Sequence, residues 1–440
     1  MEKDENPQEN KKNKELEPAG SENEFESYAL EDYIPEDEFE LEEENEGWLP
    51  PLKLVIAAVV LLAICAGGFF IARTQNEWVN QYKTNFMRNI KAIFPDWGTG
   101  SGPAKEEQAT PAPTFQTQVE NTYILPFENA SGAQFAPYDT GVVVAKSNYM
   151  AYISGDGQNI WNMNTSVVEP ILKAEGSYIL LAEKNGKKIC LYNQKKLIYA
   201  RDIEDNIITA NMSSNGDVVI VTSKEYYQGA VVVYNKDGNQ IFAWNSGSDS
   251  ILSADIAASS RRVAVSLLNA DTRAYSTVML FDVTKPESYA AQKFEDTIAF
   301  DVEFLGETLN VMGDNIAAGI SIRGKVLWTI NFEDMEFTHY AFDQEGNKML
   351  LFDNKNIPQV NFYGKSGRQK SSLTADELPD FIDLLGDSML YNSGRDVVFG
   401  KIKGNGLKKY TSSMDIQNLM MVSPDTFLIV YNNSLEFVKM

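Results

Sequence analysis

Residues 230–244 read AVVVYNKDGNQIFAW, an apolar run, a turn of Asn, Asp and Gly, and a second run ending in tryptophan. Related turn-and-strand segments occur at residues 157–161 and 324–328. They belong to a pattern that returns about every 36 to 46 residues through the last three hundred or so residues. A period of roughly 40 residues with about four strands in each unit is typical of a β-propeller. The sequence therefore predicts an all-β propeller of four-stranded blades.

We expect the propeller to occupy residues 118–440 and to contain eight units. Seven blades stay open as an alternative if the first unit, from about Ala133, belongs to the closure of the ring. The last unit contains only three apolar runs, at residues 419–422, 426–431 and 435–438. The early run at residues 122–127 can supply the fourth strand, because pairing the two ends of the domain removes exposed sheet edges.

Three units are less complete in the sequence. The second shows no clear strand before Tyr178, the fourth has a long outer connection through Pro286, and the sixth has a loop from Tyr363 to Leu373. We expect the segments in the fourth and sixth units to be connections rather than strands. The longer loops after Ser246, at residues 269–273 and at residues 365–371 are the first candidates for an interaction face.

The conspicuous polar and aromatic residues of the repeats favour structural roles. Turns such as NKDGN at residues 235–239 miss the spacing of an EF-hand loop, and hairpin turns need Asn, Asp and Gly for positive φ. Trp161, Trp244 and Trp328 end strands, where packing is expected, with a stacking site as the alternative. The sequence therefore predicts no metal-binding residues at these positions.

The net charge of −24 is concentrated at the start of the chain. Residues 1–50 contain nineteen Asp or Glu and four Lys, so we expect residues 1–48 to form a disordered acidic tail. Phe25, Tyr28 and Phe39 lie among these acids, which leaves two alternatives, a solvated tail or a segment that docks on a basic partner. This acidity argues against nucleic-acid binding, which needs clustered Lys and Arg.

A membrane segment is expected next. Residues 54–72 carry no charge, and with Leu52 and Lys53 they are long enough to cross a bilayer, which takes about 20 residues. Trp48 and Trp78 bracket the run. We expect a transmembrane helix at residues 49–73 that serves as an uncleaved signal anchor, because no basic region opens the chain.

Two segments are expected between the span and the propeller, a juxtamembrane helix at residues 74–95 and a flexible linker at residues 96–117. Arg73, Lys83, Arg88 and Lys91 would place this side in the cytoplasm by the positive-inside rule. Long domains translocate largely regardless of charge, however, and the linker is of the type that joins an outer-face domain to its anchor. We therefore expect a cytoplasmic N-terminus and an extracytoplasmic propeller at the cell membrane.

Catalytic chemistry has few candidate residues. Cys65 lies in the apolar segment and Cys190 in a strand, so no disulfide is expected, and His339 is the single histidine. The chain has no phosphate-binding glycine loop, GxSxG or HExxH motif. We expect no enzyme, no cofactor and no catalytic or metal residues, and the sequence does not assign the residues that bind a partner.

Four segments carry a resemblance: YDTGVVV at residues 138–144, YISGDGQNIW at residues 152–161, VYNKDG at residues 233–238 and DVEFL at residues 301–305. The chain resembles a family of uncharacterised, membrane-anchored propeller proteins of Gram-positive bacteria, a domain of unknown function with repeats similar to the quinoprotein and YVTN types. The resemblance covers the span and most of residues 120–440. It implies a surface-side propeller without an established activity.

The expected function is therefore a membrane-anchored scaffold that binds a protein or another ligand at the cell envelope. A protein partner is expected at a propeller face, and the acidic tail is a second candidate contact. The alternative is a propeller enzyme, such as a quinone-dependent dehydrogenase or a sugar-active enzyme, which would need a calcium site and charged cofactor contacts. A scaffold for envelope assembly is a third hypothesis that rests on fold alone.

Overall fold

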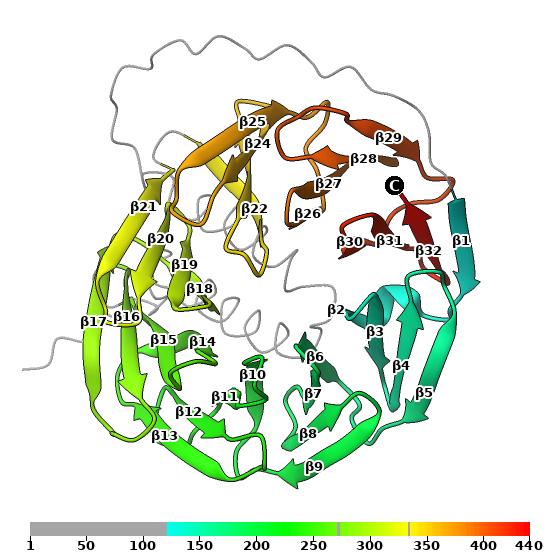
Figure 1. Ribbon diagram of the computed structural model, residues 1–440. Coiled ribbons are helices and arrows are strands. Elements are labelled where there is room, and N and C mark those ends of the chain that lie inside the picture. Colours follow the sequence, from blue (N-terminus) through cyan, green and yellow to red (C-terminus); the bar gives the residue numbers. More distant parts are fainter. Residues whose placement is uncertain (1–120, 271–272, 333–334) are drawn as a thin grey trace, which may run out of the picture. The chain divides into compact units, whose positions relative to one another are not determined.

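The propeller is an all-β ring (Figure 1). The computed structural model describes residues 121–270, 273–332 and 335–440, and these form eight antiparallel sheets of four strands each. The predicted acidic tail (1–48), membrane helix (49–73), juxtamembrane helix (74–95) and linker (96–117) lie outside the described residues and stay predictions. Within the described residues, no helix is both long enough and apolar enough to cross a bilayer.

The blades follow one another along the chain. Blade 1 contains β2 (Gln134–Tyr138), β3 (Gly141–Lys146), β4 (Tyr149–Ser154) and β5 (Asn159–Asn164). Blade 2 contains β6 (Pro170–Glu175), β7 (Tyr178–Glu183), β8 (Lys188–Asn193) and β9 (Lys196–Asp202). Blade 3 contains β10 (Ile207–Met212), β11 (Val218–Thr222), β12 (Gly229–Tyr234) and β13 (Gln240–Ser246). Blade 4 contains β14 (Ser250–Ile256), β15 (Arg262–Asn269), β16 (Tyr275–Asp282) and β17 (Ser288–Glu295).

The second half of the ring repeats this arrangement. Blade 5 contains β18 (Ala299–Leu305), β19 (Thr308–Gly313), β20 (Ile316–Ser321) and β21 (Val326–Asn331). Blade 6 contains β22 (Glu336–Phe342), β23 (Lys348–Asn354), β24 (Ile357–Tyr363) and β25 (Gln369–Thr374). Blade 7 contains β26 (Ile382–Leu385), β27 (Ser388–Ser393), β28 (Asp396–Lys401) and β29 (Lys408–Thr411). Blade 8 contains β30 (Asn418–Ser423), β31 (Thr426–Val430) and β32 (Ser434–Lys439).

The two ends of the domain close the ring. Strand β1 (Asn121–Pro126) pairs antiparallel with β32 and completes blade 8, and the short 3-10 helix η1 (Ala130–Gly132) then leads into blade 1. The predicted closure and the count of eight blades are confirmed, and the seven-bladed alternative is wrong. Because β1 begins opposite Lys439, the chain enters the propeller beside the end of β32.

The ring has two faces that the strand order defines. The first strand of each blade lies nearest the axis and the fourth lies at the rim (Figure 1); in blade 8 these are β30 and β1. Because neighbouring strands are antiparallel, the loops that enter the inner strands share one face with the loops between second and third strands. We call this the entry face, and we call the opposite face, which holds the other turns and the start of β1, the exit face.

The core is divided among the blade interfaces. Each of the eight hydrophobic clusters spans one pair of neighbouring blades, including blades 8 and 1. The middle strands are buried on both sides, as the continuous burial of β11 shows. Trp244 packs on Phe281 of the next blade with ring centroids 5.2 Å apart, and Trp161 and Trp328 also join interface clusters. The predicted packing role of the tryptophans is confirmed.

Two predicted connections are wrong, because they form the rim strands β17 and β25. Strand β6, at the axis, had no counterpart among the strands assigned from the sequence. β17 and β25 are mostly exposed or half-buried, with sequences SYAAQKFE and QKSSLT that lack a continuous apolar run. The segment 365–371 is therefore a short exit-face turn followed by β25, whereas the loop after Ser246 lies on the entry face.

Candidate functional site at the channel mouth

The inner strands of blades 3 to 6 share an irregularity near the entry face. Each contains a register shift against the second strand, at Ile208, Leu252, Phe300 and Thr338. The corresponding strand pairs of blades 1, 2 and 7 run without a shift. A β-bulge re-aims the side chains beside it, and bulges are frequent next to binding sites. In blades 5 and 6 the bulged residues line a cavity.

Aromatic rings form one wall of this cavity. It lies at the entry-face ends of the inner strands that surround the axis of the ring, and we call this place the channel mouth. Phe300 of β18 stacks with Phe337 of β22 at 6.2 Å between centroids and contacts Tyr340 at 5.9 Å. The Tyr340 hydroxyl donates a hydrogen bond to the Asp301 carboxylate. Burial, with the Asp301 charge adding to it, raises the pKa of Tyr340 well above its usual value, so the phenol stays protonated. This wall is therefore apolar and fixed.

The loop before β26 forms the other wall. Asn392, which is only 1% exposed, accepts hydrogen bonds at Oδ1 from the backbone N–H groups of Asp380 and Phe381, at 3.0 and 2.8 Å. This bond pair holds the loop where it enters the inner strand. Asn418 and Leu419 of β30 complete the lining. Four successive inner strands, β18, β22, β26 and β30, thus contribute to one site.

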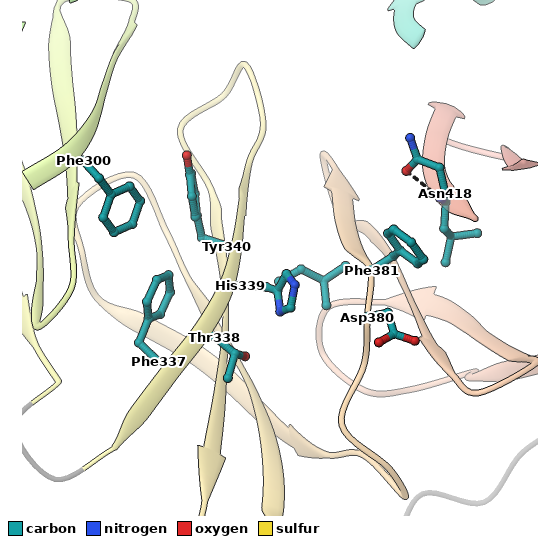
Figure 2. A pocket seen from close by; sticks show the side chains of 10 residues that line it. Phe300, Phe337, Thr338, His339, Tyr340, Asp380, Phe381 and Asn418 are labelled. Carbon is teal, nitrogen blue, oxygen red and sulfur yellow. Dashed lines mark hydrogen bonds between the residues drawn. The ribbon is translucent and has the colours of Figure 1, made fainter. Parts of the chain in front are cut away.

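His339 lies between the two walls. Figure 2 shows its ring between the Phe300, Phe337 and Tyr340 side and the Asp380, Phe381 and Asn418 side. Burial lowers the pKa of His339 to about 4, and the nearby Asp380 carboxylate offsets only part of this effect. The imidazole is therefore neutral at pH 7, where it can both donate and accept a hydrogen bond.

The cavity volume limits what can enter. It is about 60 Å³, whereas pockets for small organic ligands occupy roughly 300 to 1,000 Å³. This space suits a few water molecules or the end of one side chain. Within the described residues, no group of three or more His, Cys, Asp or Glu lies where it could hold a metal ion.

The entry face around the mouth also exposes apolar side chains. Among the described residues, every large exposed apolar side chain lies either on an outer strand or at the entry face. None of them lies in an exit-face loop. The entry-face members are Val168, Ile208, Tyr226, Tyr227, Ile357, Leu378 and Met414. Such residues mark interaction surfaces when they gather on one face.

Acidic residues accompany the apolar ones near blades 5 to 8. Their exposed carboxylates on the entry side are Asp296, Glu336, Asp376, Glu377, Asp380 and Asp415. The exposed basic residues of the loops there are Arg273, Lys355 and Arg395. Arg273 is paired with Asp296 at 3.6 Å and Arg395 with Asp415 at 2.8 Å. This part of the entry face therefore combines negative charge with apolar contact area.

Sequence reasoning missed this site. It singled out His339 only as the lone histidine and predicted no partner-binding residue. None of the three loops that it favoured lines the channel mouth: two lie elsewhere on the entry face, and the third is on the exit face. The lining comes from strands about 40 residues apart, so only alignment of the blades could have brought its members together.

The fold is an eight-bladed β-propeller of four-stranded blades, with a small cavity at the entry-face ends of its inner strands. The chain belongs to a family of unknown function, DUF5711, whose model matches residues 115–440. No curated protein matches the chain.

Solved structures resemble the propeller in fold alone. BamB from Moraxella catarrhalis is 11% identical with a TM-score of 0.50, and the match covers 73% of this chain and 99% of that one. Sqt1 from Saccharomyces cerevisiae is 10% identical with a TM-score of 0.52, covering 74% and 99%. The C-terminal WD40 domain of Sif2 is 10% identical with a TM-score of 0.54, also covering 74% and 99%.

Proposed function

We propose that the protein is a non-catalytic, single-pass membrane-anchored scaffold whose entry face binds a partner protein. The observation that carries this proposal is the coincidence, on one face, of the aromatic channel mouth and exposed apolar loops. The similarity in fold to BamB and WD40 propellers is compatible with such a role. Propellers commonly present one face of the ring as a platform for binding.

The chemistry of the face defines the partner segment. Its carboxylates favour a segment with Lys or Arg, and Leu378 and Met414 favour apolar side chains beside those charges. The cavity of about 60 Å³ admits the end of one inserted side chain. That volume is well below what a quinone or a sugar substrate needs, so the channel mouth suits an inserted side chain better than a substrate of the enzymatic alternative.

Paired variants of the full-length protein test this function. Leu378→Ser with Met414→Ser removes two entry-face side chains that are 40% and 39% exposed. Ile160→Ser with Leu197→Ser is the matched control, because these rim side chains are 54% and 46% exposed. We expect crosslinking in cells, read by mass spectrometry, to recover a stoichiometric partner from the native protein and the rim variant only. Equal recovery from the entry-face variant would contradict the proposal.

The membrane anchor and its orientation are part of the same proposal. The uncharged segment 54–72 supports a span, and the linker at 96–117 supports an extracytoplasmic propeller. Ser248→Cys introduces a thiol at an exposed entry-face position, whereas native Cys190 is buried. A membrane-impermeant maleimide should label this variant on intact cells. Labelling that requires permeabilised cells would place the propeller in the cytoplasm.

A further inference from the structure

A second cavity lies between blades 5 and 6 on the exit face, the face opposite the channel mouth. Its volume is about 360 Å³, within the range of roughly 300 to 1,000 Å³ that small-molecule sites occupy. The turn between β22 and β23 and the turn between β24 and β25 form one side, and blade 5 forms the other. The lining residues used below are Asn310, Leu327, Trp328, Glu345, Lys365 and Ser366.

Three residues of blade 5 build the floor. Asn310 of β19, Gly319 of β20 and Trp328 of β21 are successive partners across the sheet. Gly319 has no side chain, and a Cβ built there would lie 2.2 Å from Trp328 Nε1. The indole therefore lies over the Gly319 backbone, one strand spacing of about 4.8 Å from the strand that carries Asn310. This close approach directs Nε1 towards the asparagine side of the cavity.

Two polar atoms of this floor have no hydrogen-bond partner among the described residues. They are Asn310 Oδ1, on a side chain that is 1% exposed, and Trp328 Nε1, which is also buried. The Asn310 amide nitrogen does have a partner, since it donates to the Thr308 carbonyl at 3.4 Å. Both atoms are buried and belong to residues that line one cavity, and buried polar atoms are nearly always hydrogen-bonded, so the unpaired acceptor and donor point to a ligand group that enters between the two side chains.

The two atoms together select a chemical group. Asn310 Oδ1 can only accept a hydrogen bond, and Trp328 Nε1 can only donate one. A hydroxyl group satisfies both, because its proton bonds to the amide oxygen while its oxygen accepts from the indole N–H. We propose that this cavity is a carbohydrate site that binds one pyranose ring and holds a sugar hydroxyl between Asn310 and Trp328.

The rim fits a neutral ligand with many hydroxyl groups. Glu345 supplies a carboxylate and Lys365 an ammonium group, so the charges near the cavity are of both signs and favour no net charge on the ligand. The Ser366 hydroxyl adds a group that both donates and accepts. Leu327, which is 52% exposed, offers apolar contact for the C–H face of a sugar ring.

A buried lysine holds the two turns that form the rim. The Lys348 ammonium donates to the Gly346 carbonyl at 2.7 Å and to the Gly364 carbonyl at 3.4 Å. The same nitrogen lies 4.2 Å from the centroid of a Trp328 ring. Lys348 is therefore a positioning residue, because it fixes both rim turns and the indole with one fully buried charge.

The test follows the indole N–H of Trp328 directly. The full-length protein, labelled with 15N-tryptophan in a detergent without a sugar head group, is titrated with glucose, galactose and N-acetylglucosamine. The Trp328→Phe variant assigns the resonance by its loss. We expect this resonance to shift with saturation for at least one sugar, and not with sodium sulfate. Asn310→Leu should weaken that binding by at least about fivefold, because one direct hydrogen bond is lost.

Stability separates a binding role from a structural one. Asn310→Leu removes an open buried acceptor, so the variant should unfold at the same or a higher temperature than the native protein. Asn361→Leu is the matched control, since Asn361 is 4% exposed with an open Oδ1 outside the cavity lining, and it should leave sugar binding unchanged. No shift at about 100 mM of any sugar, where a millimolar site would be saturated, would overturn the proposal. Unchanged binding in Asn310→Leu would overturn it as well.

Discussion

The two faces of the propeller differ in what their loops contain. Exit-face turns consist mainly of Asn, Asp, Gly and Lys, and in the turn at residues 235–239 the Asn235 Oδ1 accepts from the N–H groups of Asp237 and Asn239. Entry-face loops expose apolar side chains and surround a cavity built on bulged strands. The difference indicates that most exit turns shape the hairpins, although two turns of blade 6 also line the second cavity, whereas the entry loops carry the surface that we propose binds a partner protein.

The largest effect on the free energy of unfolding is expected within the aromatic wall of the channel mouth. Phe337 is 8% exposed and packs against Phe332 at 5.2 Å and Phe352 at 6.0 Å between centroids. Phe337→Ala should lower the free energy of unfolding by about 3–5 kcal/mol, through lost contacts and the cavity left behind. Tyr226→Ala, at a side chain that is 91% exposed on the same face, should change it by less than about 0.5 kcal/mol. Urea denaturation measures both, and similar losses would contradict this contrast.

The next largest effect is a dependence of folding stability on pH that comes from His339. The folded-state pKa of about 4 is below the ordinary 6.5, so the unfolded chain binds a proton more readily than the folded one. This contribution to stability is present above about pH 6.5 and is lost as pH falls to about 4, up to about 3 kcal/mol. His339→Gln should remove that part of the acid destabilisation, as measured by urea titrations between pH 4 and 7.

Asp383 has the opposite effect on how stability changes with pH. Burial raises the pKa of Asp383 to about 6, so the folded protein takes up this proton first and gains stability as pH falls through 6. Asp383→Asn should therefore steepen the loss of stability on acidification, whereas His339→Gln should flatten it. The same slope change in both variants would show that other groups dominate the titration.

A smaller effect is expected at an exit turn. Gly324 has φ +82°, and a Cβ there would lie 2.3 Å from the Ala290 Cβ of the preceding blade. Gly386 has φ +61° with nothing within 4 Å of its Cβ position, so it isolates the backbone strain. Gly386→Ala should cost about 1 kcal/mol, and Gly324→Ala about 1–2 kcal/mol more, in thermal or urea unfolding. Equal costs would mean that the blade contact contributes nothing.

The smallest effect concerns the turn that resembles a calcium loop. Asn235→Ala removes the acceptor for two backbone N–H groups and should lower stability by about 1 kcal/mol. If the Asn235 side chain serves the turn alone, this loss should be the same with and without millimolar Ca²⁺. A calcium-dependent melting temperature in the native protein that disappears in the variant would favour a metal site.

The predictability of the fold follows from its burial. The middle strands have apolar runs because both their sides pack on neighbouring blades, so β11 and β12 could be predicted from residues 218–234. The rim strands β17 and β25 were missed because solvent exposure permits Ala, Gln, Lys and Ser there. The β1–β32 closure was predictable because the last unit lacked one strand.

The candidate sites were hidden for a different reason. The bulge at Phe300 and the Asn392 bonds to the loop at Asp380 depend on register, which composition does not encode. Asn310 and Trp328 become a pair only because Gly319 separates them across the sheet. Sequence periodicity thus finds the blades, whereas the sites arise where individual blades depart from the repeat.

The central claim, that the entry face is the binding surface, is tested most directly by photocrosslinking at matched positions on the two faces. A photoreactive amino acid replaces Leu378 or Met414 on the entry face, and Arg323 or Lys403 on the exit face, in the full-length protein in its native membrane. The account predicts one partner protein crosslinked from both entry positions and from neither exit position. Crosslinks to that partner from the exit positions alone would contradict it.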